Sequence, residues 1–214
     1  MPKYDAFDSN RFGVHTTALN LVGKNKKVLE IGCATGQVSR RLKENGCEVI
    51  GIEMDGESAQ MAKEHCEAVQ VADVETMEDL PYHDYFDCIL LLDVLEHLRS
   101  PLSVLKRMKA YLRKDGSIIV SLPNIANWMI RWGLLFGRFR YSDYGILDRT
   151  HLRFFDETSA RKLISDAGFE IIKFDIVPTV PIIHVRISIA HSIAKMRPNL
   201  FAKQFIIEGR LKRD

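Results

Sequence analysis

Short apolar runs alternate with amphipathic stretches between residues 28 and 122 of this chain. The run at Phe86–Leu92, for example, has Cys-Ile-Leu-Leu-Leu at its centre. A short run that is apolar throughout predicts a strand buried on both faces of a sheet. The five predicted strands are Val28–Ile31, Glu48–Ile52, Ala68–Ala72, Phe86–Leu92 and Ser117–Leu122, with helices between them at Gln37–Glu44, Glu57–Cys66 and Pro101–Leu112.

This alternation of strands and helices predicts an α/β fold, with a doubly wound and mostly parallel sheet. The pair Asp115-Gly116 predicts a turn between the last helix of the series and its strand. In sheets of this kind, ligands bind beyond the carboxyl ends of the strands. The functional residues are therefore expected directly after Ile31, Ile52, Ala72, Leu92 and Leu122.

The two ends of the chain extend this fold. The first 22 residues predict a helix before the first strand. After residue 150 the pattern predicts a helix, a strand, a helix and a last strand, at Asp156–Ala167, Phe169–Val177, Ile183–Lys195 and Phe201–Leu211. The sheet then has seven strands, and we expect residues 1–214 to form a single domain that contains an insertion at residues 123–150.

The insertion predicts a helix with one apolar face. Its apolar side chains recur at helical spacing, at Ile125, Trp128, Met129, Trp132, Leu135 and Phe136. Arginines and aromatic residues alternate after it, from Arg138 to Tyr141. The first interpretation is a helical lid over the substrate site. A homodimer contact is one alternative, and a surface for a membrane-bound or lipid-linked acceptor is another, because aromatic and basic residues together suit a membrane interface.

The composition and net charge of the chain limit its expected partners and location. The chain has 214 residues, 46% of them hydrophobic, and a net charge of +2, so we expect no nucleic acid as a partner. The four cysteines form no Cys-x-x-Cys pair, which predicts buried free thiols and a cytoplasmic location. The N-terminus lacks the apolar core of a signal peptide, and no apolar run is long enough to span a membrane.

The stretch Val-Leu-Glu-Ile-Gly-Cys-Ala-Thr-Gly at residues 28–36 is the most informative in the chain. A strand here enters a tight turn of small residues, and small residues let a ligand approach the backbone closely. The helix that follows presents unpaired N–H groups and the positive end of its dipole. The turn therefore predicts a cofactor site, whose candidate residues are Glu30, Gly32, Cys33, Ala34 and Gly36.

Acidic residues follow three of the other predicted strands. Glu53, next to Met54, is placed to accept hydrogen bonds from two ribose hydroxyls; a solvated loop acid is the alternative. The Asp73 carboxylate suits the exocyclic amine of an adenine and the Val74 N–H suits a ring nitrogen; a cap of the next turn is the alternative. Asp93 is placed to face a cationic group of the ligand.

The sequence lacks two common nucleotide-binding motifs. Counted from Gly32, the dinucleotide pattern Gly-x-Gly-x-x-Gly needs a third glycine where Gln37 stands, and no Gly-x-x-x-x-Gly-Lys-Ser/Thr occurs. Asp73 and Asp93 would also repel a pyrophosphate. A ligand with a ribose, an adenine and a cationic amino-acid tail suits these residues better.

As a set, these residues resemble the class I S-adenosylmethionine-dependent methyltransferases. Residues 28–36 match the first motif of that family, with Ala34 where many members carry glycine. Glu53 and Asp73 match its ribose and adenine positions. Two further matches, at the fourth and fifth strands, are Leu92–Leu98 and Leu112–Ser121.

The resemblance implies a Rossmann-like methyltransferase fold whose last strand, here Phe201–Leu211, is antiparallel. It also implies S-adenosylmethionine as the cofactor and S-adenosylhomocysteine as the product. The segment Tyr144–Phe155 resembles bacterial methyltransferases that act on sugar, glycan-linked or quinone-like small molecules. The Asn-Pro-Pro-Tyr motif of nucleic-acid amino-methylating enzymes is absent after the fourth strand, so base methylation is not expected.

His151 is the candidate catalytic residue on the acceptor side. Histidine is a natural base for a hydroxyl near neutral pH, so we interpret His151 as a base or an orienter, with loop packing as the alternative. We expect the acceptor in a cleft between Asp93, Asn124 and His151. Glu96 and His97 fit a surface or loop-packing role equally well. Histidines and aspartates at metal-ligand spacing are absent, so we expect no metal.

The sequence thus predicts methyl transfer from S-adenosylmethionine to an oxygen or nitrogen of a small-molecule acceptor. One alternative is a module that binds S-adenosylmethionine or S-adenosylhomocysteine without turnover. The other is a nicotinamide-dependent oxidoreductase, against which the missing third glycine argues.

Overall fold

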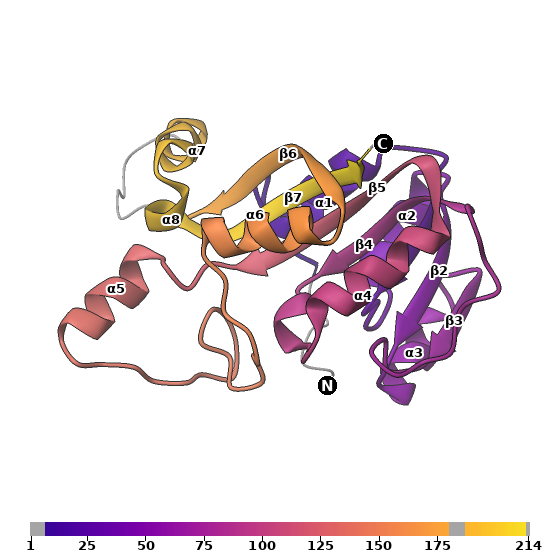
Figure 1. The fold of residues 1–214 in the computed structure, drawn as a ribbon, viewed down its shortest axis with the longest axis horizontal. Coiled ribbons are helices and arrows are strands. Elements are labelled where there is room, and N and C mark those ends of the chain that lie inside the picture. Colours follow the sequence, from indigo (N-terminus) through magenta and orange to yellow (C-terminus); the bar gives the residue numbers. More distant parts are fainter. Residues whose placement is uncertain (1–6, 180–186, 213–214) are drawn as a thin grey trace.

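Seven strands form a single mixed sheet in the order β3-β2-β1-β4-β5-β7-β6 (Figure 1). The structure, a computed structural model, describes residues 7–179 and 187–212. The strands are β1 Lys27–Ile31, β2 Glu48–Glu53, β3 Ala68–Val71, β4 Phe86–Leu92, β5 Leu112–Pro123, β6 Phe169–Pro178 and β7 Ala202–Leu211. β7 is antiparallel to β5 and β6, and the pairs from β3 to β5 are parallel. The predicted sheet is confirmed, including its antiparallel last strand.

Helices cover both faces of this sheet. The helices are α1 Val14–Val22, α2 Gln37–Glu44, α3 Gly56–Ala62, α4 Pro101–Met108 and α6 Glu157–Asp166. Alternate residues of the central strands point to opposite faces. Leu90 packs in one buried cluster with residues of α1 and α2, while Leu91 packs in the other with residues of α4 and α6. α4 and α6 lie in front of the sheet in Figure 1.

The N-terminal helix is shorter than predicted, and the prediction that it includes residues 7–13 is wrong. α1 begins at Val14, after an extended Gly13. The Asp8 and Asn10 side chains accept hydrogen bonds from the Asn10 and Phe12 N–H groups, respectively. Such side-chain bonds offer the backbone an alternative to a helix, and here they form turns. Residues 1–6, which the prediction also included, lie outside the described residues.

The boundary between α4 and β5 also differs from the prediction. α4 ends at Met108, a short 3₁₀ helix follows at Lys109–Tyr111, and β5 already begins at Leu112. The predicted turn at Asp115-Gly116 is an irregularity in the pairing of β4 with β5. A Cβ at Gly116 would lie 3.0 Å from the Phe86 carbonyl oxygen, so this close approach of the two strands favours glycine.

The C-terminal third contains two further helices, α7 Ile187–Met196 and α8 Pro198–Phe201. The predicted helix Ile183–Lys195 coincides with α7 from residue 187, and its residues 183–186 lie outside the described part. α7 packs on β6, and α8 leads directly into β7. No helix among the described residues is long and apolar enough to cross a membrane.

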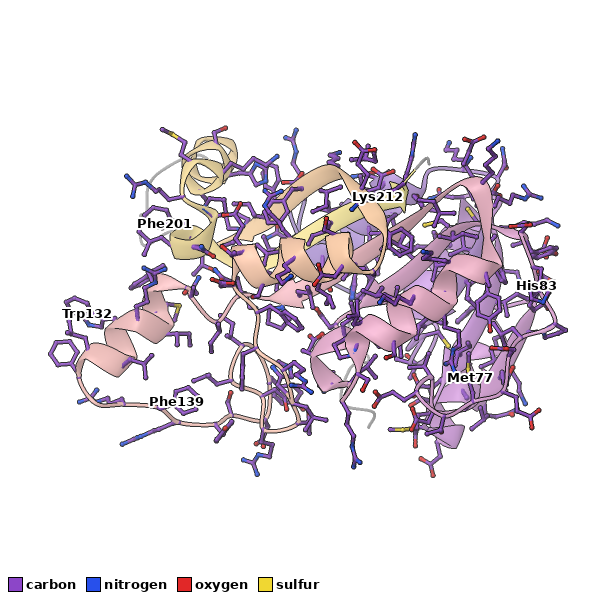
Figure 2. The ribbon with its side chains drawn as sticks, viewed as in Figure 1. Met77, His83, Trp132, Phe139, Phe201 and Lys212 are labelled. Atoms are coloured by element: carbon purple, nitrogen blue, oxygen red, sulfur yellow. The ribbon has the colours of Figure 1, made fainter. Side chains whose placement is uncertain are left out.

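The insertion contains the predicted helix, α5 Trp128–Leu135, but this helix stands away from the sheet (Figure 1). The start of this helix is anchored: the Trp128 indole N–H donates to the Thr179 carbonyl at 2.9 Å, and the Asn127 amide donates to the Ala202 carbonyl at 2.7 Å. Trp132 lies at the periphery, 59% exposed (Figure 2). The structure does not place α5 as a lid over the site. The dimer contact and the membrane surface stay predictions.

Candidate cofactor and acceptor site

The turn after β1 is held against the end of β2. The N–H groups of Gly32 and Cys33 donate to the Ile52 carbonyl at 2.7 and 3.2 Å, and the Gly36 N–H donates to the Cys33 carbonyl at 2.8 Å. Three residues of the turn have positive φ: Gly32 at 71°, Ala34 at 46° and Gly36 at 81°. The backbone therefore bends sharply where the sequence predicts close approach of a cofactor.

Glu53 lies at the end of β2, directly beside this turn. Its Oε2 accepts from the Ala34 N–H and its Oε1 accepts from the Asp55 N–H, both at 2.9 Å. These two bonds fix the orientation of the carboxylate, and each oxygen retains accepting capacity. The structure thus brings Glu53 and the glycine turn together as predicted. Met54, the next residue, is 72% exposed and lies at the surface of this site.

Asp73 and Val74 follow β3, at the edge of the same end of the sheet. The Asp73 Oδ1 accepts from the Glu75 N–H at 2.8 Å, so Asp73 does cap the next turn, the alternative weighed from the sequence. The Val74 side chain is buried, and its carbonyl accepts from the Arg107 guanidinium. The adenine-binding role of both residues stays a prediction.

Glu30 is buried beneath the turn, 4% exposed, and its Oε2 accepts from the Ser39 hydroxyl at 2.5 Å. Burial raises the pKa of Glu30 to about 8, and the Ser39 hydrogen bond opposes that rise. The carboxyl group is therefore mainly neutral in the folded chain at neutral pH. A neutral acid avoids the large free energy of burying a charge.

Glu30 makes the stability of the chain depend on pH. Because folding raises its pKa, its contribution is full below pH 4.5 and is lost as the pH rises towards 8, by about 1.4 kcal/mol of unfolding free energy per pH unit. Glu30→Gln, which cannot ionise, should flatten this part of the profile, measured by urea unfolding from about pH 5 to about pH 8. Glu57→Gln, at an exposed acid, is the control. An unchanged slope in Glu30→Gln would contradict this account.

Asp93 follows β4 and is fixed by side chains of β5 and β7. Its Oδ1 accepts from the Ser121 hydroxyl of β5 and from the Gln204 amide of β7, both at 2.6 Å. Its φ of 56° turns the backbone out of the strand. Burial lowers the pKa of His15 in α1, and the charges of Asp93 and Asp8 partly oppose this. Sequence reasoning found Asp93 but missed these partners.

A pocket of about 160 Å³ opens beside Asp93 and extends to His151. It is lined by Asp93, Glu96, His97, Pro123, Gly145, Ile146, Asp148, His151, Lys203 and Gln204. The predicted cleft therefore joins Asp93 to His151 but excludes Asn124. The Asn124 side chain is fully buried, donates to three carbonyls near the start of β7 and accepts from the Ala126 N–H, so its role is structural.

His151 forms part of the acceptor end of this pocket. Its Nδ1 lies 3.1 Å from the Ile146 carbonyl, which can only accept, so in the neutral ring Nδ1 carries the proton and Nε2 does not. Burial lowers the pKa of His151, and the nearby His97 lowers it further. The neutral ring with an unprotonated Nε2 is the form that can accept a hydrogen bond from an acceptor hydroxyl.

Glu96 and His97 lie in this pocket, in the 3₁₀ helix Leu95–His97. Glu96 is only 1% exposed, so the interpretation of Glu96 as a surface residue is wrong. The main chain around it holds the segment that follows the insertion, because the Glu96 carbonyl accepts from the Leu152 and Arg153 N–H groups at 2.8 and 3.0 Å. The sequence signal was present, since a glutamate and a histidine stand in the short segment between a buried strand and the next helix.

The sequence model of a methyltransferase domain family matches residues 7–173 of this chain. The chain belongs to this family. A curated relative of the methyltransferase domain is the ubiquinone biosynthesis O-methyltransferase of Haemophilus ducreyi, 32% identical over 120 residues, which are 52% of this chain and 50% of that protein. The corresponding protein of Bradyrhizobium diazoefficiens is 31% identical over 55% of this chain and 47% of its own length. The chain spans about half the length of these curated relatives.

Solved structures share the fold of this methyltransferase domain. A SAM-dependent methyltransferase from Archaeoglobus fulgidus superposes with a TM-score of 0.64 at 18% identity, over 90% of this chain and 89% of that one. The 1,6-didemethyltoxoflavin-N1-methyltransferase of Burkholderia thailandensis, solved with S-adenosylhomocysteine, gives 0.62 at 18% identity, over 94% and 77%. The predicted Rossmann-like methyltransferase fold is confirmed.

Proposed function

We propose that this chain transfers a methyl group from S-adenosylmethionine to a hydroxyl oxygen of a small-molecule acceptor. One observation carries the proposal: a single pocket extends from Asp93, beside the predicted cofactor turn, to His151, directly after the insertion. A methyl donor on one side and an acceptor on the other need such a continuous space, because the reacting atoms must come within van der Waals contact.

The residues of the turn fit S-adenosylmethionine. The positive-φ backbone at Gly32, Ala34 and Gly36 gives the methionine and ribose parts close access. The Glu53 carboxylate, already oriented by two N–H groups, would accept from the ribose hydroxyls. Asp93 would face the cationic amino-acid end. When bound, S-adenosylmethionine supplies an electrophilic methyl group on a positively charged sulfur.

The acceptor side supports oxygen rather than nitrogen chemistry. The relatives from Haemophilus ducreyi and Bradyrhizobium diazoefficiens are named as ubiquinone biosynthesis O-methyltransferases. A phenolic, quinone-like hydroxyl is therefore the first acceptor to test, with sugar hydroxyls second. The unprotonated Nε2 of His151 would accept the hydrogen bond of that hydroxyl and orient its oxygen.

The sequence left two alternative functions open, an oxidoreductase and a binding module without turnover. The match to a methyltransferase domain gives no support to a nicotinamide-dependent oxidoreductase. A module that binds S-adenosylmethionine without turnover has the same fold and the same turn, so only product formation distinguishes it. Purified protein is therefore incubated with S-adenosylmethionine and catechol-type acceptors, and S-adenosylhomocysteine and the methyl ether are measured by mass spectrometry. Equal amounts of S-adenosylhomocysteine and methyl ether support the proposal, and no turnover with any hydroxyl acceptor contradicts it.

Replacing His151 by alanine is expected to lower kcat by about 100-fold or more, because a positioned proton-accepting side chain contributes 10²–10⁴-fold. S-adenosylmethionine binding, measured by calorimetry, should stay within about twofold, since His151 lies on the acceptor side of the pocket. The control is His83→Ala, which changes an exposed histidine that does not line the pocket. Undiminished turnover in His151→Ala would contradict the assigned role.

A further inference from the structure

Two cysteines that are distant in the sequence lie side by side at the cofactor turn. All four cysteines of the chain are buried and free, as the sequence predicted. Cys33 belongs to the turn itself, and Cys66 lies between α3 and β3. A Cβ at Gly51 of β2 would lie 2.7 Å from the Cys33 sulfur and 3.4 Å from the Cys66 sulfur. Both sulfurs therefore occupy the space beside this glycine.

The glycine at position 51 makes room for this pair. Gly51 lies inside β2, where glycine weakens a strand and often marks a close approach of other atoms. Any side chain at this position would displace the two sulfurs. Cys33 and Cys66 belong to the same buried apolar cluster, and their side chains are hydrogen-bonded to each other. The fold thus builds a thiol pair that sequence spacing did not reveal.

The two thiols of this pair differ in acidity. The hydrogen bond from Cys33 lowers the pKa of the Cys66 thiol to about 7, although burial opposes this. Ser39 and the Lys43 charge lower it further, and the Glu67 charge raises it. The hydrogen bond with Cys66 raises the pKa of Cys33, as does burial. Cys66 therefore ionises first, and the thiolate is the reactive form of cysteine.

The cofactor turn and the end of α3 also touch at a second place. A Cβ at Gly36 would lie 3.0 Å from the Ala62 Cα and 3.2 Å from the His65 ring. The main chain of Cys33 holds the turn together, because its N–H donates to the Ile52 carbonyl and its carbonyl accepts from the Gly36 N–H. A displacement of Cys33 would therefore change the turn that the cofactor approaches.

We propose that Cys33 and Cys66 form a site of reversible oxidation, at which hydrogen peroxide produces a disulfide that weakens cofactor binding. The Cys66 thiolate attacks one peroxide oxygen and the O–O bond breaks, which gives a sulfenic acid; the hydroxide that leaves takes up the proton that Cys66 had released. The Cys33 thiol attacks this sulfur, the S–O bond breaks, and the hydroxide leaves with the Cys33 proton as water. Two thiols and one peroxide thus give one disulfide and two waters, and a dithiol reductant reverses the reaction.

The disulfide acts on cofactor binding through the position of Cys33. A covalent bond brings the two sulfurs closer than a non-bonded contact allows, so it pulls Cys33 towards the end of α3. The neighbouring Gly32 and Ala34 then lose the positive-φ geometry that gives a ligand access to the backbone. This inference rests on the proposed function for the identity of the cofactor, S-adenosylmethionine.

The disulfide is tested first by peptide mapping. Purified protein is treated with hydrogen peroxide, the remaining thiols are blocked, and the chain is digested without reduction. Trypsin is combined with Glu-C, because trypsin alone leaves Cys66 and Cys88 on one peptide, residues 64–99. We expect a peptide pair that joins Cys33 to Cys66 and disappears with dithiothreitol. Absence of this pair would overturn the proposal, as would preferential pairing of other cysteines.

Cofactor affinity is then measured by calorimetry. The reduced protein should bind S-adenosylmethionine, and the oxidised protein should bind it at least about tenfold more weakly, which lies within the usual range of coupling between two sites. Dithiothreitol should restore the affinity. This recovery excludes oxidation of the exposed Met54 as the cause, since methionine sulfoxide needs its own reductases. Unchanged affinity in protein with a fully formed disulfide would overturn the proposal.

The variants assign the peroxide effect to this pair. Cys66 lies outside the turn, so Cys66→Ser and Cys66→Ala should bind S-adenosylmethionine as the reduced unchanged protein does and should keep that affinity in peroxide. Two replacements, one polar and one apolar, provide a folded variant for the measurement. Cys88→Ala is the matched control, because Cys88 is also buried and burial raises its pKa to about 12. Loss of the peroxide effect in Cys88→Ala, or its persistence in both Cys66 variants, would contradict the assignment.

The two proposals fail in different ways. If the reduced protein does not bind S-adenosylmethionine, the proposed function is wrong, whatever the peptide map shows. If the reduced protein binds S-adenosylmethionine but peroxide forms no bond between Cys33 and Cys66, this inference is wrong while the proposed methyl transfer stands.

Discussion

Glu53→Gln is expected to weaken S-adenosylmethionine binding by about 10- to 100-fold. The carboxylate accepts from the Ala34 and Asp55 N–H groups and would also accept from the ribose hydroxyls. A hydrogen bond to a charged group contributes about 1.5–3 kcal/mol, and each 1.4 kcal/mol is a factor of ten in affinity. Glutamine keeps the shape, but it removes the charge and replaces one accepting oxygen by a donor. Calorimetric titration with S-adenosylmethionine measures the change directly.

Two comparisons make this result specific. Glu57→Gln removes a neighbouring exposed charge and should leave affinity within about twofold, because surface charges contribute little. Acceptor binding should also be preserved in Glu53→Gln, since Glu53 does not line the acceptor pocket. If Glu53→Gln binds S-adenosylmethionine as tightly as the unchanged chain, the ribose role is wrong, and Glu53 only holds the turn.

The parts of the fold that sequence predicted best are those with strong local patterns. The five apolar residues Cys88–Leu92 predict a buried strand whatever their neighbours are, and β4 contains them all. The α2 boundaries Gln37 and Glu44 match the prediction, because the glycines at positions 36 and 46 punctuate the chain on both sides. Errors occurred where local side-chain bonds replaced a helix, as at Asp8 and Asn10.

The residues at the cofactor end of the site could also be predicted from short stretches of sequence. Residues 32–36 form one turn, and Glu53 and Asp93 directly follow apolar strands, so the rule that ligands bind at strand ends was sufficient to find them. Ser121 offered the same kind of signal, since a polar residue interrupts the apolar end of β5. Gln204 offered none, because its contact with Asp93 depends on the pairing of β7 with β5.

The acceptor end depended on tertiary structure. His151 reaches His97 because the Glu96 carbonyl binds the backbone at residues 152 and 153, a contact between segments more than 50 residues apart. Sequence spacing alone cannot find a pocket wall assembled in this way. The position of α5 also depends on tertiary structure. Its periodicity predicted a helix correctly, but periodicity does not determine what covers the apolar face of that helix.

Substitutions at Ala34 should change the unfolding free energy of the chain, because its φ of 46° lies in the region that glycine prefers. Ala34→Gly should therefore raise the unfolding free energy by about 1 kcal/mol, in line with the 1–2 kcal/mol that a left-handed conformation costs other residues. Ala34→Val should lower it by about 1–3 kcal/mol, because a β-branched side chain is strained there. Urea unfolding of the three proteins measures the order.

The same pair of variants tests how closely the cofactor approaches the turn. If the backbone at Ala34 contacts S-adenosylmethionine, Ala34→Val should also weaken its binding by about tenfold or more, whereas Ala34→Gly should leave affinity nearly unchanged. Cofactor binding is measured at a temperature where both variants are fully folded, which separates affinity from stability. A valine variant that is less stable yet binds normally would show that the turn has a strained backbone but no close ligand, and the cofactor would then have to lie elsewhere along the strand ends.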